Sequence, residues 1–113
     1  MAKKITIRQL SNRIKKKQVI LVDVMAEEIH RNVHIKGAIN IPYSKLEHDA
    51  YIMLNPGDVI ITYSIDYDCP VSRFAAEKLI EMGFRKVYYY QGGLQEWLEA
   101  NLPVVRSAAP AAD

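Results

Sequence analysis

The chain has 113 residues, half of them hydrophobic and a quarter charged, so it can bury one core but is too short for two domains. A net charge of +2 is too small to indicate a nucleic-acid partner, and no apolar stretch is long enough to cross a membrane. The single cysteine excludes a disulfide within the chain. Because the first residues are unlike a signal peptide, we expect a cytoplasmic protein whose thiol stays reduced.

The first half of the chain alternates between predicted helices and strands. Residues 6–17 have apolar side chains at helical spacing, and Thr6 is the expected N-cap of this helix. The aliphatic run at 19–24 predicts a strand that is buried on both faces. A short helix is expected at 27–32, followed by a short strand at 37–42 that ends at a proline.

The second half continues the alternation. Ser44 is the expected N-cap of a helix that ends before the turn at 55–58. The remaining elements are expected in the order strand, helix, strand, helix: 59–63, 72–82 with Gly83 after its end, 86–90, and a last helix after the turn at 91–93. We expect one domain at 1–105 and a flexible tail at 106–113.

The alternating elements predict an α/β fold with a mainly parallel central sheet and helices on both faces. Binding sites in such folds lie beyond the carboxyl ends of the strands. The strand at 59–63 leads into a loop with Cys69, and Asp23 ends another buried strand, where we expect its carboxylate to be hydrogen-bonded. Unpaired backbone N–H groups and the positive end of a helix dipole favour a thiolate at this junction.

Three blocks of the chain carry a family pattern: 21–42, with Asp23-Val24 and His34-Ile35-Lys36-Gly37-Ala38; 63–79, with Ser72 and Ala75-Ala76; and 87–104, with Gly92-Gly93, Trp97 and Leu102-Pro103-Val104. Together they resemble the single-domain rhodanese-like (sulfurtransferase) family. The resemblance implies the rhodanese-like three-layer fold. It also implies transfer of a sulfane sulfur through a cysteine persulfide, held by inward-pointing N–H groups of a loop.

The chain departs from that family at the expected nucleophile. The family's catalytic cysteine usually follows the strand directly, whereas here Ser64 stands there and the thiol of Cys69 comes five positions later. Met25 stands where many members have arginine. A hydroxyl cannot form a stable persulfide, so Cys69 is the candidate catalytic residue. The remaining candidates, expected to bind substrate, surround it: Ile65, Asp66, Tyr67, Asp68, Ser72 and Arg73.

Three functions remain open from the sequence. The leading prediction is a sulfurtransferase or persulfide carrier that uses Cys69, needs no cofactor, and takes sulfur from a small donor or a protein persulfide partner. Arg73 and the helix start favour this activity, whereas Asp66 and Asp68 repel anionic donors and Pro70 removes one loop N–H. The alternative is a catalytically inactive binding or regulatory module, because Ser64 replaces the usual nucleophile. A third candidate is a thiol redox sensor.

Two other kinds of site are not expected. Only three residues separate Cys69 from Arg73, fewer than a cysteine-phosphatase loop needs. His30 and His34 lie four residues apart, but no cysteine or carboxylate cluster accompanies them, so we expect no metal site.

Overall fold

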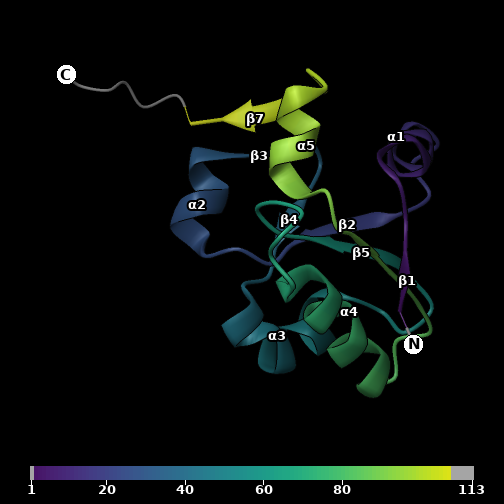
Figure 1. The fold of residues 1–113 in the computed structure, drawn as a ribbon. Helices are drawn as coiled ribbons and strands as arrows, with labels where there is room; N and C mark the ends of the chain where they lie inside the picture. The colour runs from purple at the N-terminus through teal and green to yellow at the C-terminus, as the bar shows by residue number, and fades with distance from the viewer. Residues whose placement is uncertain (1, 108–113) are drawn as a thin grey trace.

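A five-stranded parallel sheet forms the centre of the computed structural model, which describes residues 2–107 (Figure 1). Its strand order is β1-β6-β5-β2-β4. The strands are β1 (Lys3–Lys4), β2 (Ile20–Asp23), β4 (Ile39–Asn40), β5 (Val59–Tyr63) and β6 (Lys86–Tyr90). The helices are α1 (Ile7–Lys15), α2 (Glu27–Asn32), α3 (Leu46–Met53), α4 (Val71–Glu81) and α5 (Gly93–Glu99), with a 3₁₀ turn η1 at Tyr43–Lys45.

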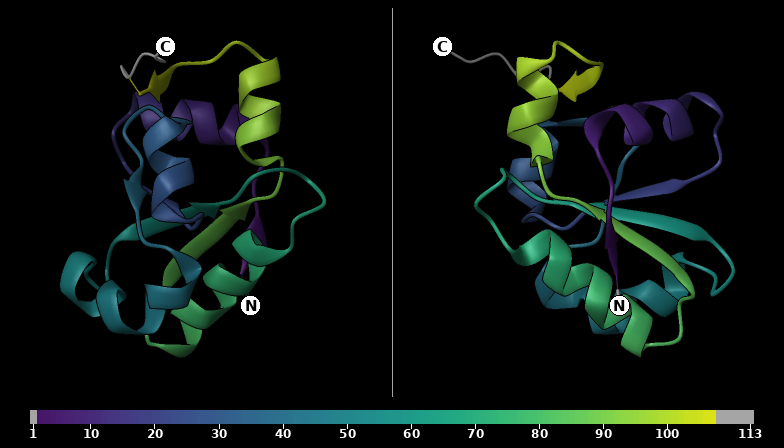
Figure 2. Two further views of the ribbon diagram at one scale, coloured as in Figure 1. Left: turned by 90° about the vertical axis from the view of Figure 1, so that its left-hand side faces the viewer. Right: turned by 45° about the vertical axis from the view of Figure 1, so that its right-hand side comes forward.

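Helices cover both faces of the sheet, which confirms the predicted α/β fold class (Figure 2). One core cluster joins the sheet to α3 and α4, and the other joins it to α1 and α5. The central strand β5 contributes to both clusters, because Ile60 packs in the first and the adjacent Ile61 in the second. This two-sided burial explains why the central strands are mostly apolar, with Asp23 and Thr62 as their buried polar residues.

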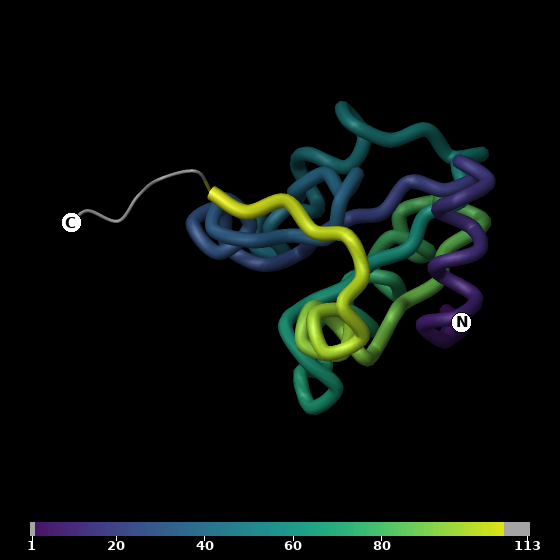
Figure 3. Tube along the Cα trace, turned by 90° about the horizontal axis from the view of Figure 1, so that it is seen from above, coloured from purple at the N-terminus to yellow at the C-terminus, as the bar shows by residue number. Residues whose placement is uncertain are grey.

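A second, two-stranded sheet was not expected from the sequence. The strand β3 (Val33–Ile35) pairs antiparallel with β7 (Val104–Arg106), so the two run side by side (Figure 3). Beyond β7, the N–H of Ser107 donates to the carbonyl of Asn32 at 2.9 Å. Residues 106 and 107 of the expected tail therefore belong to the described structure, and residues 108–113 lie outside the described part.

Several element ends differ from the sequence predictions. The helix predicted to reach residue 17 ends at Lys15, since Lys17 has a left-handed φ of 55°. The strand predicted at 37–42 shortens to Ile39–Asn40, because Gly37 turns the chain with a φ of 90°. Ser44 does not cap a helix: it lies within η1, and α3 begins after Lys45 without any side-chain cap.

Other expectations were confirmed. Thr6 caps α1 in a capping box, with its hydroxyl accepting from the Gln9 N–H and the Gln9 side chain accepting from the Thr6 N–H. The helix at 27–32 and the strands at 59–63 and 86–90 have the predicted bounds, and α4 begins one residue earlier than predicted. Among the described residues, no helix combines the length and apolar character needed to cross a bilayer.

Candidate functional site

The loop between β5 and α4 lies at the carboxyl edge of the central sheet, as predicted. Tyr63, the last residue of β5, pairs in register with Asp23, the last residue of β2. The loop then begins at Ser64 and ends at Pro70, which immediately precedes α4. Residues that end two neighbouring strands are therefore brought to one place, which is how parallel sheets commonly form sites.

Ser64 and Cys69 come into contact within this loop. The Oγ of Ser64 lies 3.3 Å from the Sγ of Cys69, a distance suited to a hydrogen bond with sulfur. Ser64 is buried with 5% of its surface exposed, whereas Cys69 is partly exposed. The thiol is thus close to the residue that directly follows the strand, although the two lie five positions apart in the chain.

Asp66 produces the turn that returns Cys69 to Ser64. Its carboxylate Oδ1 accepts from the N–H of Asp68 and from the N–H of Cys69, each at 3.1 Å, and its carbonyl also accepts from Cys69 at 3.2 Å. A short acidic side chain that binds N–H groups just ahead of it is a common device for stabilising turns. The structure therefore gives this predicted substrate-binding residue an internal, loop-forming role.

The start of α5 holds the loop from the other side. The N–H groups of Leu94 and Gln95 donate to the carbonyls of Ser64 and Ile65, both at 2.9 Å. Gly93 has a φ of 69°, and a Cβ at this position would approach the Ser64 carbonyl oxygen to 2.7 Å. Only glycine fits so close to the loop backbone. The sequence identified this segment as a tight turn but gave no sign that it packs on the loop.

The remaining predicted substrate-binding residues separate into two groups. Ile65, Tyr67 and Asp68 are exposed on the loop, and the Tyr67 carbonyl accepts from the Gln91 side chain at 3.0 Å. Ser72 is buried within α4, where its carbonyl accepts from the Thr62 hydroxyl at 2.7 Å.

Arg73 lies over an aromatic ring. Its guanidinium carbon is 5.3 Å from the centre of the Phe74 ring, an arrangement typical of a cation–π contact. Among the described residues, no hydrogen bond or ion pair joins Arg73 to Cys69. The side chain expected to hold a sulfur anion therefore contacts an aromatic ring.

A cleft of about 500 Å³ opens beside Ser64 and is mainly apolar. Its lining comes from the segment after β2, α2, η1 with the residue before it, the loop and the first residue of α4: Val24, Met25, Ala26, Ile29, Pro42, Tyr43, Ser44, Ser64, Ile65 and Val71. Cys69 lies outside this lining. Met25 is part of the lining and contributes an apolar side chain to it. Sequence reasoning missed this cleft because its residues come from four separate segments.

A buried carboxylate lies beneath the site and is fully hydrogen-bonded, as expected for Asp23. Its Oδ1 accepts from the Met25 N–H at 2.8 Å, and its Oδ2 accepts from His30 Nδ1 at 2.7 Å and the Tyr63 hydroxyl at 3.2 Å. Burial raises the pKa of Tyr63 well above its usual range, and the charge of Asp23 raises that pKa further. This network joins the ends of β2 and β5 to α2.

The two histidines considered as a metal pair have other partners. Their rings stack with 3.7 Å between centroids, and His34 Nδ1 donates to the His30 carbonyl at 2.7 Å. His30 Nδ1 is occupied by the bond to Asp23. In the part of the chain that the structure describes, no three His, Cys, Asp or Glu side chains are grouped as a metal site requires.

Comparisons with known proteins agree with this fold along most of the chain. The family model for the rhodanese-like domain matches residues 6–100. A protein named thiosulfate sulfurtransferase GlpE, from Shewanella oneidensis, is 34% identical over 101 residues, which cover 88% of this chain and 95% of that protein. An uncharacterized protein from Buchnera aphidicola is 29% identical over 96 residues, and the chain spans only 62% of its length.

Solved structures show the same similarity. The crystal structure of the BH2092 protein from Bacillus halodurans matches with a TM-score of 0.87 and 34% sequence identity. The match covers 99% of this chain and 82% of that one. The similarity therefore includes the whole described fold.

Proposed function

Because the chain belongs to the rhodanese-like family, with named sulfurtransferases among its relatives, we propose that it is a sulfur carrier that uses Cys69. One observation carries the proposal: Cys69 Sγ lies 3.3 Å from Ser64 Oγ, at the residue that directly follows β5. The only thiol of the chain is thus beside the position that a family nucleophile would occupy. The reducing cytoplasm that we propose as its location would keep this thiol available.

Ser64 takes the position of the usual family cysteine in this proposal. Its hydroxyl cannot carry a sulfane sulfur, but it can donate a hydrogen bond to a thiolate or persulfide on Cys69. The bonds from Leu94 and Gln95 to the loop hold Ser64 in place for that role. Ser64 therefore acts as a positioning residue and Cys69 as the catalytic one.

The proposed transfer needs neither an oxidant nor a reductant. The Cys69 thiolate attacks the outer sulfur of a donor persulfide, a new S–S bond forms, and the donor leaves as a thiolate with the electrons of the broken S–S bond. An acceptor thiolate then attacks the outer sulfur on Cys69 in the same way. The second step regenerates the Cys69 thiolate.

The charges near Cys69 favour a persulfide donor over thiosulfate. Asp66 and Asp68 place carboxylates next to the thiol in the chain, and Arg73 is directed to Phe74 instead. Two nearby carboxylates repel the doubly charged thiosulfate more strongly than the singly charged –S–S⁻ group of a persulfide. We therefore propose a small persulfide or a protein persulfide as the sulfur donor.

Mass spectrometry of the intact protein tests this function. After incubation with glutathione persulfide and removal of excess donor, the wild type should gain one sulfur atom, and peptide mapping should locate it on Cys69. Cys69→Ala should gain none. Ser64→Ala should still accept sulfur but load more slowly, because it loses only the hydrogen bond. A wild-type protein that remains unmodified would rule out the carrier function.

A second candidate is the inactive binding module, and the cleft beside Ser64 favours it. This cleft is apolar and Cys69 is not in its lining, so a bound partner would not meet the thiol. The same measurement separates the two functions. If the protein is an inactive module, the wild type should gain no sulfur, whereas the Ser64→Cys, Cys69→Ala double variant should gain sulfur. If that double variant also stays unmodified, the loop itself does not support persulfide formation.

A further inference from the structure

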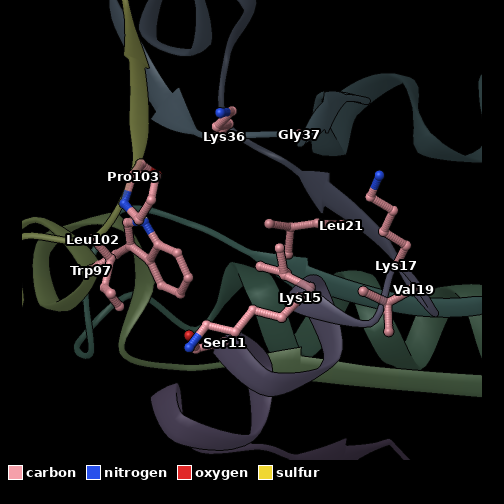
Figure 4. A pocket seen from close by; sticks show the side chains of 11 residues that line it. Ser11, Lys15, Lys17, Val19, Leu21, Lys36, Gly37, Trp97, Leu102 and Pro103 are labelled. Atoms are coloured by element: carbon pink, nitrogen blue, oxygen red, sulfur yellow. The ribbon is translucent and has the colours of Figure 1, made fainter.

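A second cleft, of about 480 Å³, lies among α1, β2, α5 and the turn at Lys36 and Gly37 (Figure 4). It opens beside Val19, before the first residue of β2, whereas the Ser64 cleft lies past the last residue of that strand. The two clefts share no lining residue. Neither the rhodanese-like fold nor the proposed sulfur transfer needs this second cleft.

The inner surface of the second cleft is apolar and its walls are held by hydrogen bonds. Its apolar side chains come from α1, from β2 and the residue before it, and from α5 and the segment after it: Ile14, Val19, Leu21, Trp97, Leu102 and Pro103. The Pro103 carbonyl accepts from the Trp97 indole Nε1 at 2.8 Å and from the Lys36 N–H at 3.2 Å. The Pro103 carbonyl thus joins Trp97 and Lys36, which lie on different sides of the cleft lining, so the cleft is formed before any ligand enters.

Lysines are the charged residues of this lining. Three of the 11 lining residues are lysines, namely Lys15, Lys17 and Lys36, and none is acidic (Figure 4). Within residues 2–107, the ion pairs involve other side chains, so these three ammonium groups lack a carboxylate partner within 4.0 Å. Uncompensated cations beside a low-dielectric surface create a potential that attracts anions.

We propose that this cleft binds a small organic anion with an apolar body, a medium-chain monocarboxylate. The hydrocarbon would lie against Leu21 and Trp97, and the carboxylate would lie at the lysines of the lining. The volume of the cleft is in the range typical of small-molecule sites, about 300–1,000 Å³. The apolar lining is complementary to the hydrocarbon chain of such a ligand, and the lysines are complementary to its negative charge.

Trp97 makes the test direct, because it is the only tryptophan of the chain and lines the cleft. Decanoate is the probe, and uncharged decanamide is its matched control. Decanoate should change Trp97 fluorescence saturably, and decanamide should bind about tenfold more weakly, as expected for the loss of two or three surface ion pairs. Raising the salt concentration should weaken decanoate binding and leave decanamide binding unchanged.

Variants locate the site and separate it from the sulfur chemistry. Lys15→Gln and Lys36→Gln should each weaken decanoate binding about two- to fivefold. Lys45→Gln, an exposed lysine outside the lining, should have no effect. Cys69→Ala should bind decanoate with wild-type affinity. The test of decanoate binding therefore does not depend on whether Cys69 accepts sulfur.

Three outcomes would overturn the proposal. One is the lack of a saturable response to decanoate in both fluorescence and titration calorimetry. Another is equal affinity for decanoate and decanamide, which would mean that the lysines do not select for charge. The third is wild-type affinity in the Lys15→Gln, Lys36→Gln double variant, which would place the ligand elsewhere.

Discussion

Among single residues, Gly93 packs so close to the backbone of the Cys69 loop that a Cβ at its position would not fit. Its positive φ of 69° is one constraint, and the 2.7 Å distance at which a Cβ would meet the Ser64 carbonyl is a second. Gly83 meets only the first constraint, since its φ is 107° but nothing lies within 4 Å of its Cβ position. Comparing the two glycines therefore separates the free-energy cost of backbone strain from the cost of steric crowding.

Alanine substitutions measure these two contributions. Gly83→Ala should lower the free energy of unfolding by about 1–3 kcal/mol through backbone strain alone. Gly93→Ala should cost about 1–3 kcal/mol more, because the new methyl group displaces the loop. Urea unfolding gives both values. Equal losses in the two variants would contradict a close fit between α5 and the loop.

At the scale of elements, the Thr62 hydroxyl joins β5 to α4. Thr62 is fully buried, and its Oγ1 donates to the Ser72 carbonyl at 2.7 Å. The loop with Cys69 begins and ends at these two elements, so this bond fixes the distance that the loop must span. A strand and a helix thereby define the frame in which Ser64 and Cys69 meet.

Thr62→Val tests this connection with little change in side-chain volume. The variant should lose about 1 kcal/mol of stability, the usual net value of one hydrogen bond. Hydrogen exchange should accelerate at the Phe74 N–H, which donates to Pro70 in the first turn of α4. Thr62→Ser keeps the hydroxyl and should retain that protection. Faster exchange in both variants would assign the effect to packing.

At the scale of the whole molecule, two buried tyrosines make stability depend on alkaline pH. Tyr63 and Tyr90 both belong to the core cluster that packs under α1 and α5. Burial raises the pKa of each well above its usual range, and hydrogen-bonded carboxylates, Asp23 and Glu96, add to the effect. Both phenols therefore stay protonated in the native state when the unfolded chain has lost these protons.

The sign of the pH effect follows from this difference. Tyrosine in the unfolded chain has a pKa of about 10. Below this pH, both phenols are protonated in the native and in the unfolded state, so they give stability no pH dependence. Above it, the unfolded state binds fewer protons, so stability falls by about 1.4 kcal/mol per pH unit for each tyrosine. Urea unfolding between about pH 10 and 11.5 measures the slope. Tyr90→Phe should halve it, and an unchanged slope would contradict the assignment.

Much of the fold could be predicted from local patterns. Runs and spacings of apolar residues identified the central strands and the helices α1, α4 and α5, and the side chain of Thr6 identified a helix start. By contrast, β1 consists of two exposed lysines that become a strand only by pairing with Tyr88 and Tyr89. The β3–β7 pair depends on segments about 70 residues apart, which no local pattern reveals.

The candidate site was predictable in position but not in geometry. The sequence placed Ser64, Cys69 and Asp23 at one edge of the sheet, because that edge follows from strand direction. It could not predict that the Asp66 carboxylate folds the loop so that the thiol meets Ser64. Both clefts were also missed, since each is lined by side chains from several distant segments.

The 3.3 Å approach of Ser64 to Cys69 bears on how long a loaded sulfur would persist. A second thiol at position 64 would attack the inner sulfur of a persulfide on Cys69, form a disulfide and expel hydrosulfide. A serine hydroxyl is too poor a nucleophile for that reaction. With oxygen at one position and sulfur at the other, a sulfur loaded on Cys69 would meet no second thiol within the chain, and its release would wait for an incoming acceptor.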